Sequence, residues 1–273
     1  MSSIIKDSLK KILYQASKPI LGRVGKFNGI HKGESCYIFG DGVSIKSMDL
    51  ELFAEKPSIA VNYFPFHKDF DAINCLYCVV NAPYFFSPLF GYESEQKRHL
   101  YGMSKLYREL MCRRSHMNYF IDLSNYPFVR GENVYHTFRN FPDQRLTPDF
   151  IGNRINCFAG VSRAAMMLAI YMGFEHIYLV GFDYTHAPSR NHHYYEKGRG
   201  IFHTRKIHEK DFYEIAKEFI DITTITLDGA SELLNSVTYK EYTGREPAYK
   251  ENIDLVNEQH LNALATWPGY AIY

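Results

Sequence analysis

The stretch that decides the fold is RINCFAGVSRAAMMLAIYMGFEHIYLVGFDYTH, residues 154–186. It predicts a tight turn, a buried helix that begins after Gly160, a short turn at Gly173 and a strand over residues 177–180. The strand ends at Gly181, and polar residues follow it as far as His186. Because ligands bind beyond the carboxyl ends of strands in an open α/β sheet, residues 181–186 form the first candidate site.

Three further apolar runs, all in the first third of the chain, end in the same way. They cover residues 35–39, 58–61 and 75–80, and they are followed by Gly40, Asn62 and Asn81. This pattern is typical of parallel strands whose carboxyl ends carry ligand-binding loops. The predicted fold class is therefore α/β, with a Rossmann-like, mostly parallel sheet and helices on both faces.

Composition limits the classes of protein to consider. The chain has 273 residues, of which 46% are hydrophobic, so a folded domain with a sizeable core is expected. Its net charge of +1 gives no electrostatic reason to expect a nucleic-acid partner. The five cysteines are an odd number, and several lie in apolar runs, which predicts buried, reduced thiols and a cytoplasmic protein. No apolar run reaches the ~18 residues that span a bilayer, and no secretory signal is visible.

The chain divides into an N-terminal segment, residues 1–30, and an α/β domain, residues 31–273. Apolar residues recur at helical spacing within residues 1–21, with lysines between them. Such an amphipathic helix packs on the protein body, lies on an anionic membrane face or contacts a partner subunit. Residues 185–207 lack apolar periodicity and are rich in His, Tyr, Arg and Gly, which predicts a lid or binding loop.

The turn Gly40-Asp41-Gly42-Val43-Ser44 follows the first strand of the sheet. Glycines there let backbone N–H groups approach a phosphate, although the turn matches neither GxGxxG nor a Walker A sequence. An ordinary strand-to-helix turn is the alternative. Asp41 would repel a phosphate unless a cation or a hydroxyl lies between them. Asn62 and Asn81 suit a nucleobase or a sugar hydroxyl, or else serve as turn residues.

Several residues in and before the long loop suit transfer chemistry. Arg154 is able to bind a phosphate or carboxylate through two hydrogen bonds, or to form a surface ion pair. A histidine with a near-neutral pKa is able to take a proton from a sugar hydroxyl. The candidates are His186, His192, His193, His203 and His208. None of their spacings matches a zinc motif, so no metal is expected. The hydroxyls of Tyr184, Tyr194 and Tyr195 either hydrogen-bond a leaving phosphate or pack within the loop.

Together these motifs resemble the bacterial sialyltransferases that decorate lipooligosaccharide, a Rossmann-like, GT-A-like group that uses CMP-activated nonulosonic acids. The same fold family relates more distantly to archaeal pterin pyrophosphokinase-like and flagellin-glycosylating proteins. The resemblance covers roughly residues 35–235 and is clearest over residues 158–183.

The family pattern carries over position by position. Its glycine turn resembles residues 40–44, with Asp41 where the family usually has asparagine, and its two nucleotide-contacting asparagines resemble Asn62 and Asn81. Its arginine-containing turn resembles residues 154–161, with two extra residues and with Ala159 in place of a serine. Its Gly-x-Asp strand end resembles residues 181–183, and its catalytic histidine aligns with His208. Of its two phosphate-binding tyrosines, one aligns with Thr185, next to Tyr184, and the other falls near Tyr194.

The resemblance implies an inverting, metal-independent glycosyltransferase of lipopolysaccharide or capsule biosynthesis. His208 would deprotonate the acceptor, and Tyr184 with Tyr194 or Tyr195 would hydrogen-bond the departing CMP. The donor would be held by Gly40, Asp41, Gly42, Ser44, Asn62, Asn81, Arg154, Ala159, Gly160, Gly181 and Asp183. No cofactor is required beyond the CMP-sugar donor. The implied partners are a glycan or lipooligosaccharide acceptor, further copies of the chain in a homo-oligomer, and the inner membrane face.

Two other functions stay open at this point. An ATP- and Mg²⁺-dependent pyrophosphokinase of the related pterin type would use Asp41 and Asp183 as metal ligands. A non-catalytic sugar-nucleotide-binding protein would bind CMP without turnover. The differences at Asp41, Ala159 and the tyrosines also leave room for another CMP-linked 2-keto sugar or another nucleotide.

Overall fold

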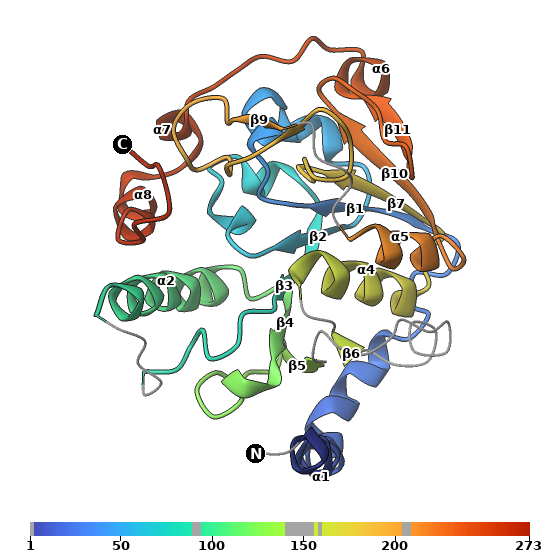
Figure 1. Cartoon of the computed structure of the whole chain (residues 1–273), viewed down its shortest axis with the longest axis vertical. Helices are drawn as coiled ribbons and strands as arrows, with labels where there is room; N and C mark the ends of the chain where they lie inside the picture. Colours follow the sequence, from blue (N-terminus) through green and yellow to red (C-terminus); the bar gives the residue numbers. More distant parts are fainter. Residues whose placement is uncertain (1–2, 89–93, 140–155, 158–159, 204–208) are drawn as a thin grey trace.

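A single sheet of parallel strands organises the protein (Figure 1). The computed structural model describes residues 3–88, 94–139, 156–157, 160–203 and 209–273. Within these residues the sheet has nine strands, and every pairing is parallel. They are β1 (Ser35–Phe39), β2 (Ser58–Val61), β3 (Cys75–Val80), β4 (Asn118–Asp122), β5 (Val134–Arg139), β6 (Asn156–Cys157), β7 (His176–Val180), β10 (Asp221–Thr226) and β11 (Asn235–Thr238). The predicted α/β class and parallel sheet are confirmed.

The strand order places a topological switch point between β1 and β7. The order is β11-β10-β7-β1-β2-β3-β4-β5-β6, so the chain builds outward from β1 as far as β6 and then returns to the other side of β1. Phe39 pairs with Val180 in this central pair, so both strands end at the same level of the sheet. A crevice at such a point is the usual ligand site of open α/β sheets.

Helices cover both faces of the sheet, as the sequence predicted. Successive residues of β1 alternate between two cores, because side chains alternate along a strand. Cys36 and Ile38 pack with α4 (Val161–Met172) and α5 (Lys210–Ala216). Tyr37 and Phe39 belong to the opposite core, which includes α2 (Ser94–Arg113) and α8 (Glu258–Leu264).

The helix α4 begins and ends at glycines, in agreement with the predicted turn, helix and turn. Gly160 precedes it with φ +113°, and Gly173 follows it with φ +86°, a left-handed conformation that glycine adopts without strain. The backbone N–H of Gly173 closes the helix on the carbonyl groups of Ala169 and Ile170. The next residues enter β7, so α4 carries the chain from β6 at one end of the sheet to β7 at the switch point.

The remaining elements lie around this central unit. They are α1 (Ser3–Leu21), α6 (Tyr239–Thr243), α7 (Asn252–Leu255) and the hairpin of β8 (Ser189–Arg190) and β9 (Phe202–His203). The amphipathic N-terminal helix is thus confirmed. No helix in the described part of the chain is both long and apolar enough to cross a membrane.

The cysteines follow the prediction only in part. Cys36, Cys75 and Cys78 are buried and free, as expected for reduced core thiols. Cys112 is also free, but it is exposed near the C-terminal end of α2, so its expected burial was wrong. Its position beside basic residues of the solvent-facing side explains the difference.

Candidate functional site

The loops that follow β1 and β7 pack directly against one another at the switch point. The N–H of Gly40 donates to the carbonyl of Val180 at 2.8 Å, and the N–H of Gly42 donates to that of Gly181 at 2.9 Å. A Cβ atom on Gly42 would lie 2.5 Å from the Gly181 oxygen and 2.7 Å from a carboxylate oxygen of Asp183. These glycines therefore permit a close backbone approach, and the amide donors expected to face a phosphate are engaged within the protein.

Asp183 joins the two loops through its side chain. It is 2% exposed, and Oδ2 accepts a hydrogen bond from the Ser44 N–H at 2.9 Å. Burial raises the pKa of Asp183 above its usual value, although hydrogen bonds from Ser44 oppose this rise. Asp183 thus holds the glycine turn onto the end of β7, in the position where the sequence placed a donor-binding residue.

Asp41 has an unused acceptor in the same turn. Its side chain is 9% exposed, Oδ2 accepts a hydrogen bond from the Tyr63 N–H at 3.3 Å, and Oδ1 has no partner among the described residues. Burial raises the pKa of Asp41 to about 7, opposed by the charge of His193 and by backbone N–H groups. Since buried polar atoms are normally hydrogen-bonded, the open oxygen points to a donor group on a ligand.

The two predicted asparagines lie at the same edge of the sheet. Asn62 follows β2 with φ +45°, and its carbonyl accepts a hydrogen bond from the Tyr107 hydroxyl at 2.6 Å. Asn81 follows β3, is 6% exposed and donates from Nδ2 to the Gly160 carbonyl at 3.2 Å. This last bond brings the N-terminus of α4 to the ends of the strands, so the structure gathers most of the predicted donor-binding positions.

Glu209 occupies the N-terminus of α4, which the sequence analysis missed. Its carboxylate accepts from the Ser162 hydroxyl at 2.9 Å and pairs with Arg163 at 2.9 Å. A carboxylate is favoured there because the helix dipole and the first N–H groups attract negative charge. The contact joins the start of α5 to α4, and only the tertiary structure shows it.

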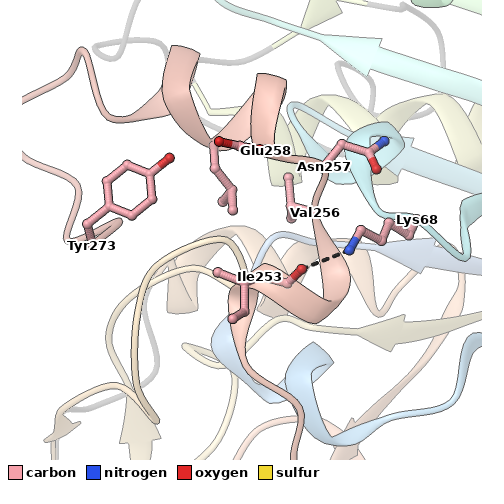
Figure 2. A pocket seen from close by; sticks show the side chains of 7 residues that line it. Lys68, Ile253, Val256, Asn257, Glu258 and Tyr273 are labelled. Atoms are coloured by element: carbon pink, nitrogen blue, oxygen red, sulfur yellow. Dashed lines mark hydrogen bonds between the residues drawn. The ribbon is translucent and has the colours of Figure 1, made fainter.

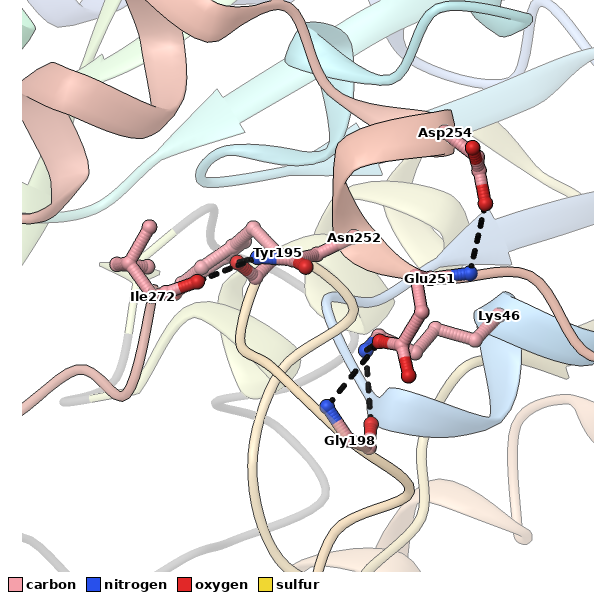
Figure 3. Close-up of polar contacts among 7 residues, drawn as sticks. All are labelled: Lys46, Tyr195, Gly198, Glu251, Asn252, Asp254 and Ile272. Atoms are coloured by element: carbon pink, nitrogen blue, oxygen red, sulfur yellow. Dashed lines mark hydrogen bonds and ion pairs between the residues drawn. The ribbon is translucent and has the colours of Figure 1, made fainter.

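The predicted lid is fastened to the glycine turn over its described residues, 185–203. Gly42 pairs with His193 in an antiparallel bridge, and the Tyr194 N–H donates to the Asp41 carbonyl at 2.9 Å. Buried Lys46 donates from Nζ to the Gly198 carbonyl at 2.7 Å and contacts Glu251 at 3.3 Å (Figure 3). The loop is therefore held on the glycine turn.

The C-terminal segment fastens the other side of this loop. Asn252, which begins α7, is 2% exposed and donates from Nδ2 to the carbonyl groups of Tyr195 and Ile272, at 3.0 and 2.9 Å (Figure 3). The Lys197 N–H donates to the Ala271 carbonyl at 2.6 Å. Residues 251–272 therefore hold this loop from a second side.

The predicted catalytic side chains have different surroundings. Tyr194 and Tyr195 are buried, and burial raises the pKa of both hydroxyls. The Tyr194 hydroxyl donates to the Tyr63 carbonyl at 2.9 Å, so this hydroxyl has a protein partner where a phosphate was expected. Tyr184 is 43% exposed. His208, Arg154 and Ala159 lie outside the described residues.

A histidine and a glutamate form a pair that the sequence analysis did not single out. His193 Nδ1 lies 2.7 Å from Oε2 of Glu196, and the imidazole stacks on Tyr195 with ring centroids 4.9 Å apart. Burial raises the pKa of Glu196, but hydrogen bonds from His193 and the Ala271 N–H outweigh it and hold the pKa below its usual value. An ionised Glu196 therefore orients the imidazole of His193 beside Asp41.

A separate pocket of about 390 Å³ lies beside α7 and α8 (Figure 2). Lys68 spans one side of it and donates from Nζ to the Ile253 carbonyl at 2.8 Å. Its lining is Lys68, Ile253, Val256, Asn257, Glu258, Leu261 and Tyr273, none of which is a predicted site residue. Among the described residues there is also no cluster of three or more side chains suited to a metal ion.

Comparisons with known proteins give remote structural likenesses. No family model and no curated protein matches the chain. A Maf glycosyltransferase from Magnetospirillum magneticum is 10% identical, with a TM-score of 0.43. The match covers 89% of this chain and 40% of the Magnetospirillum chain. The sialyltransferase CstII from Campylobacter jejuni, solved with a CMP substrate analogue, is 14% identical with a TM-score of 0.41, and covers 86% of this chain and 98% of its own.

A third neighbour is an α-2,3-sialyltransferase from Campylobacter jejuni, 14% identical with a TM-score of 0.37. It covers 70% of this chain and 74% of its own. The chain thus spans 40% of the length of the Magnetospirillum protein and more of the two sialyltransferases.

Proposed function

We propose that the protein is a glycosyltransferase that moves sialic acid or a related 2-keto sugar from a CMP-activated donor to a hydroxyl of a cell-surface glycan. The proposal is supported chiefly by one observation: a buried carboxyl with an unused oxygen, Asp41, lies at the switch point of a parallel sheet. Asn62, Asn81 and the N-terminus of α4 lie at the same edge. Such an edge suits a nucleotide, whose sugar and base offer several hydrogen-bond donors.

The proposed reaction is a single displacement with inversion and without a metal. The acceptor oxygen attacks the anomeric carbon of the donor sugar, the bond from that carbon to the phosphate oxygen breaks, and CMP leaves. His208, which lies outside the described residues, takes the acceptor proton in the assignment that the sequence resemblance suggests. Tyr184 hydrogen-bonds the departing phosphate in that assignment. The loop held on the glycine turn would limit hydrolysis by excluding water.

The open oxygen of Asp41 also keeps the pyrophosphokinase as a second candidate. A Mg²⁺ ion prefers carboxylate ligands, and Asp41 offers one free oxygen in a buried site. Asp183 is less suited, because Oδ2 already accepts the Ser44 N–H. In this alternative ATP, and not CMP, would bind, and only with Mg²⁺.

Thermal-shift binding of CMP, UMP, GDP and ATP, each with and without Mg²⁺, tests the proposal. A ligand at a hundredfold excess over its dissociation constant stabilises the folded state by ~2.7 kcal/mol. We expect stabilisation by CMP that is indifferent to Mg²⁺. A shift with ATP and Mg²⁺ alone would replace the proposal with the pyrophosphokinase.

Turnover separates an enzyme from a non-catalytic binding protein. We expect CMP to be released from CMP-N-acetylneuraminate or a related donor in the presence of a glycan acceptor. His208→Ala should lower this rate by ~10²–10⁴-fold, the usual contribution of a general base. His116→Ala, at an exposed histidine near the end of α2, is the matched control and should leave the rate unchanged. CMP binding without turnover by any donor would leave only the binding protein.

A further inference from the structure

Among the described side chains of the N-terminal helix α1, those that contact the rest of the protein lie along one side. Tyr14 packs edge-on against Phe138 of β5, with ring centroids 5.3 Å apart, and Ser17 is 6% exposed. The helix lies at the edge of the molecule, beyond β5 and β6 (Figure 1). Its body-facing side is therefore the one that carries Tyr14 and Ser17.

The apolar stripe of α1 lies on a different side. Leu9, Ile12 and Leu13 are spaced by three and four residues and so share one face of the helix. They are 52%, 65% and 54% exposed, and Ala16 on the same face is also exposed. An amphipathic helix normally buries its apolar stripe, so this arrangement leaves the stripe open for another surface.

The charge of the N-terminal segment indicates which surface that is. Residues 1–32 contain seven Lys or Arg and one Asp, whereas the whole chain has 31 basic and 30 acidic residues. The basic excess is therefore concentrated around α1, and the rest of the chain is net acidic. A symmetric contact between the α1 helices of two copies would bring like charge against like charge, whereas an anionic lipid surface is complementary.

We propose that α1 binds an anionic membrane surface, with Leu9, Ile12 and Leu13 inserted at the level of the lipid headgroups. Apolar residues beside lysines on one short helix are the pattern of helices that lie in the membrane interface. The proposal is independent of the proposed glycosyl transfer.

The attachment of α1 would hold the protein body close to the lipid. Arg23, two residues after α1, donates from its guanidinium group to the carbonyl groups of Gly131 and Glu132 at 3.1 and 3.0 Å. Lys26 lies over the Tyr135 ring at 4.7 Å. The segment after α1 is thus fixed to the loop before β5 and to β5 itself, so a bound helix would orient the sheet relative to the membrane.

Co-sedimentation of the full chain with lipid vesicles tests this proposal. We expect binding to phosphatidylcholine vesicles that contain about 30% phosphatidylglycerol, and much weaker binding to phosphatidylcholine alone. Lys10→Gln with Lys11→Gln should weaken binding about 25-fold, since each basic residue near the surface contributes about fivefold. The triple variant Leu9→Gln, Ile12→Gln, Leu13→Gln should weaken binding at least about tenfold while keeping the charge.

A matched control and a mass measurement make the test decisive. Ile201→Gln with Ile253→Gln changes residues that are 55% and 60% exposed elsewhere, and it should bind vesicles like the wild type. The five apolar side chains that are changed in the triple variant and the control are all more than half exposed, so circular dichroism and melting should show intact folding of both. Equal binding to both vesicle types, or unchanged binding of the triple variant, would overturn the proposal. So would light scattering that shows the triple variant converting an oligomer to monomers, because α1 would then be a subunit interface.

Discussion

Replacing Asp41 by asparagine should remove a pH dependence of stability that the buried carboxyl creates. The side chain is 9% exposed, and burial raises the pKa of Asp41 from 3.8 to about 7. A raised pKa means that the folded state prefers the protonated carboxyl. The resulting stability is fully present below the unfolded pKa of 3.8 and is lost as the pH rises through 7.

The size of the effect follows from these two values. A rise from 3.8 to about 7 corresponds to about 4 kcal/mol in the free energy of unfolding across the whole range. Between about pH 5 and about pH 8, the wild type should lose about 2.5 kcal/mol from this carboxyl alone. Asp41→Asn has nearly the same shape and no titration, so it should not show this loss.

Urea unfolding of both proteins at several pH values measures the difference directly. The stability of the asparagine variant relative to the wild type should increase by about 2.5 kcal/mol between about pH 5 and about pH 8. Asp69→Asn, at an exposed carboxyl after β2, is the control and should give parallel curves. Parallel curves for Asp41→Asn as well would show that Asp41 is ionised in the folded protein throughout, and would refute the reasoning.

Three further results are expected. Gly42→Ala should lower the free energy of unfolding in urea by about 1–3 kcal/mol and weaken CMP binding, because the added Cβ would clash with the backbone oxygen of Gly181. The control Gly22→Ala has open space around its Cβ and should cause no comparable loss. Glu196→Gln should lower CMP release at least about tenfold, because Glu196 orients His193 beside Asp41 in the proposed donor site. An unchanged rate would show that His193 has no part in transfer. Burial lowers the pKa of His136 from 6.5 to about 4, so the folded state prefers the neutral imidazole. The stability that this preference contributes is fully present above pH 6.5 and is lost as the pH falls through 4. The melting temperature of His136→Phe should therefore fall less in acid than that of the wild type.

Local sequence signals were sufficient for the central sheet. The apolar runs before Gly40, Asn62, Asn81 and Gly181 became neighbouring strands, because each run is short, buried on both faces and closed by a turn-forming residue. Parallel pairing then brought their ends to one edge. The gathering of the predicted donor-binding residues followed from this arrangement without any long-range information.

The surroundings of the individual side chains required the tertiary structure. Tyr194 was expected to face a phosphate, but it lies in a turn where both tyrosines are buried, and its hydroxyl donates to the carbonyl of Tyr63, 131 positions earlier in the chain. The contact of Glu209 with Ser162 of α4 joins residues 47 positions apart, so it depends on the tertiary structure. A helix as short as α7 contains too few residues to show an apolar period. The hydrogen bond from Asn252 at its start to the carbonyl of Tyr195 was therefore not visible in the sequence.

The contact of Lys46 with Glu251 has a consequence for biosynthesis. The two residues are 205 positions apart, and the loop between Tyr195 and Gly198 is held from both sides only when residues 251–272 are present. At ~5–20 residues per second, a ribosome needs on the order of ten seconds or more to travel that distance. During this interval the early strands emerge with their glycine turn uncovered. A nascent chain would therefore hold an incomplete candidate site until residues 251–272 are made.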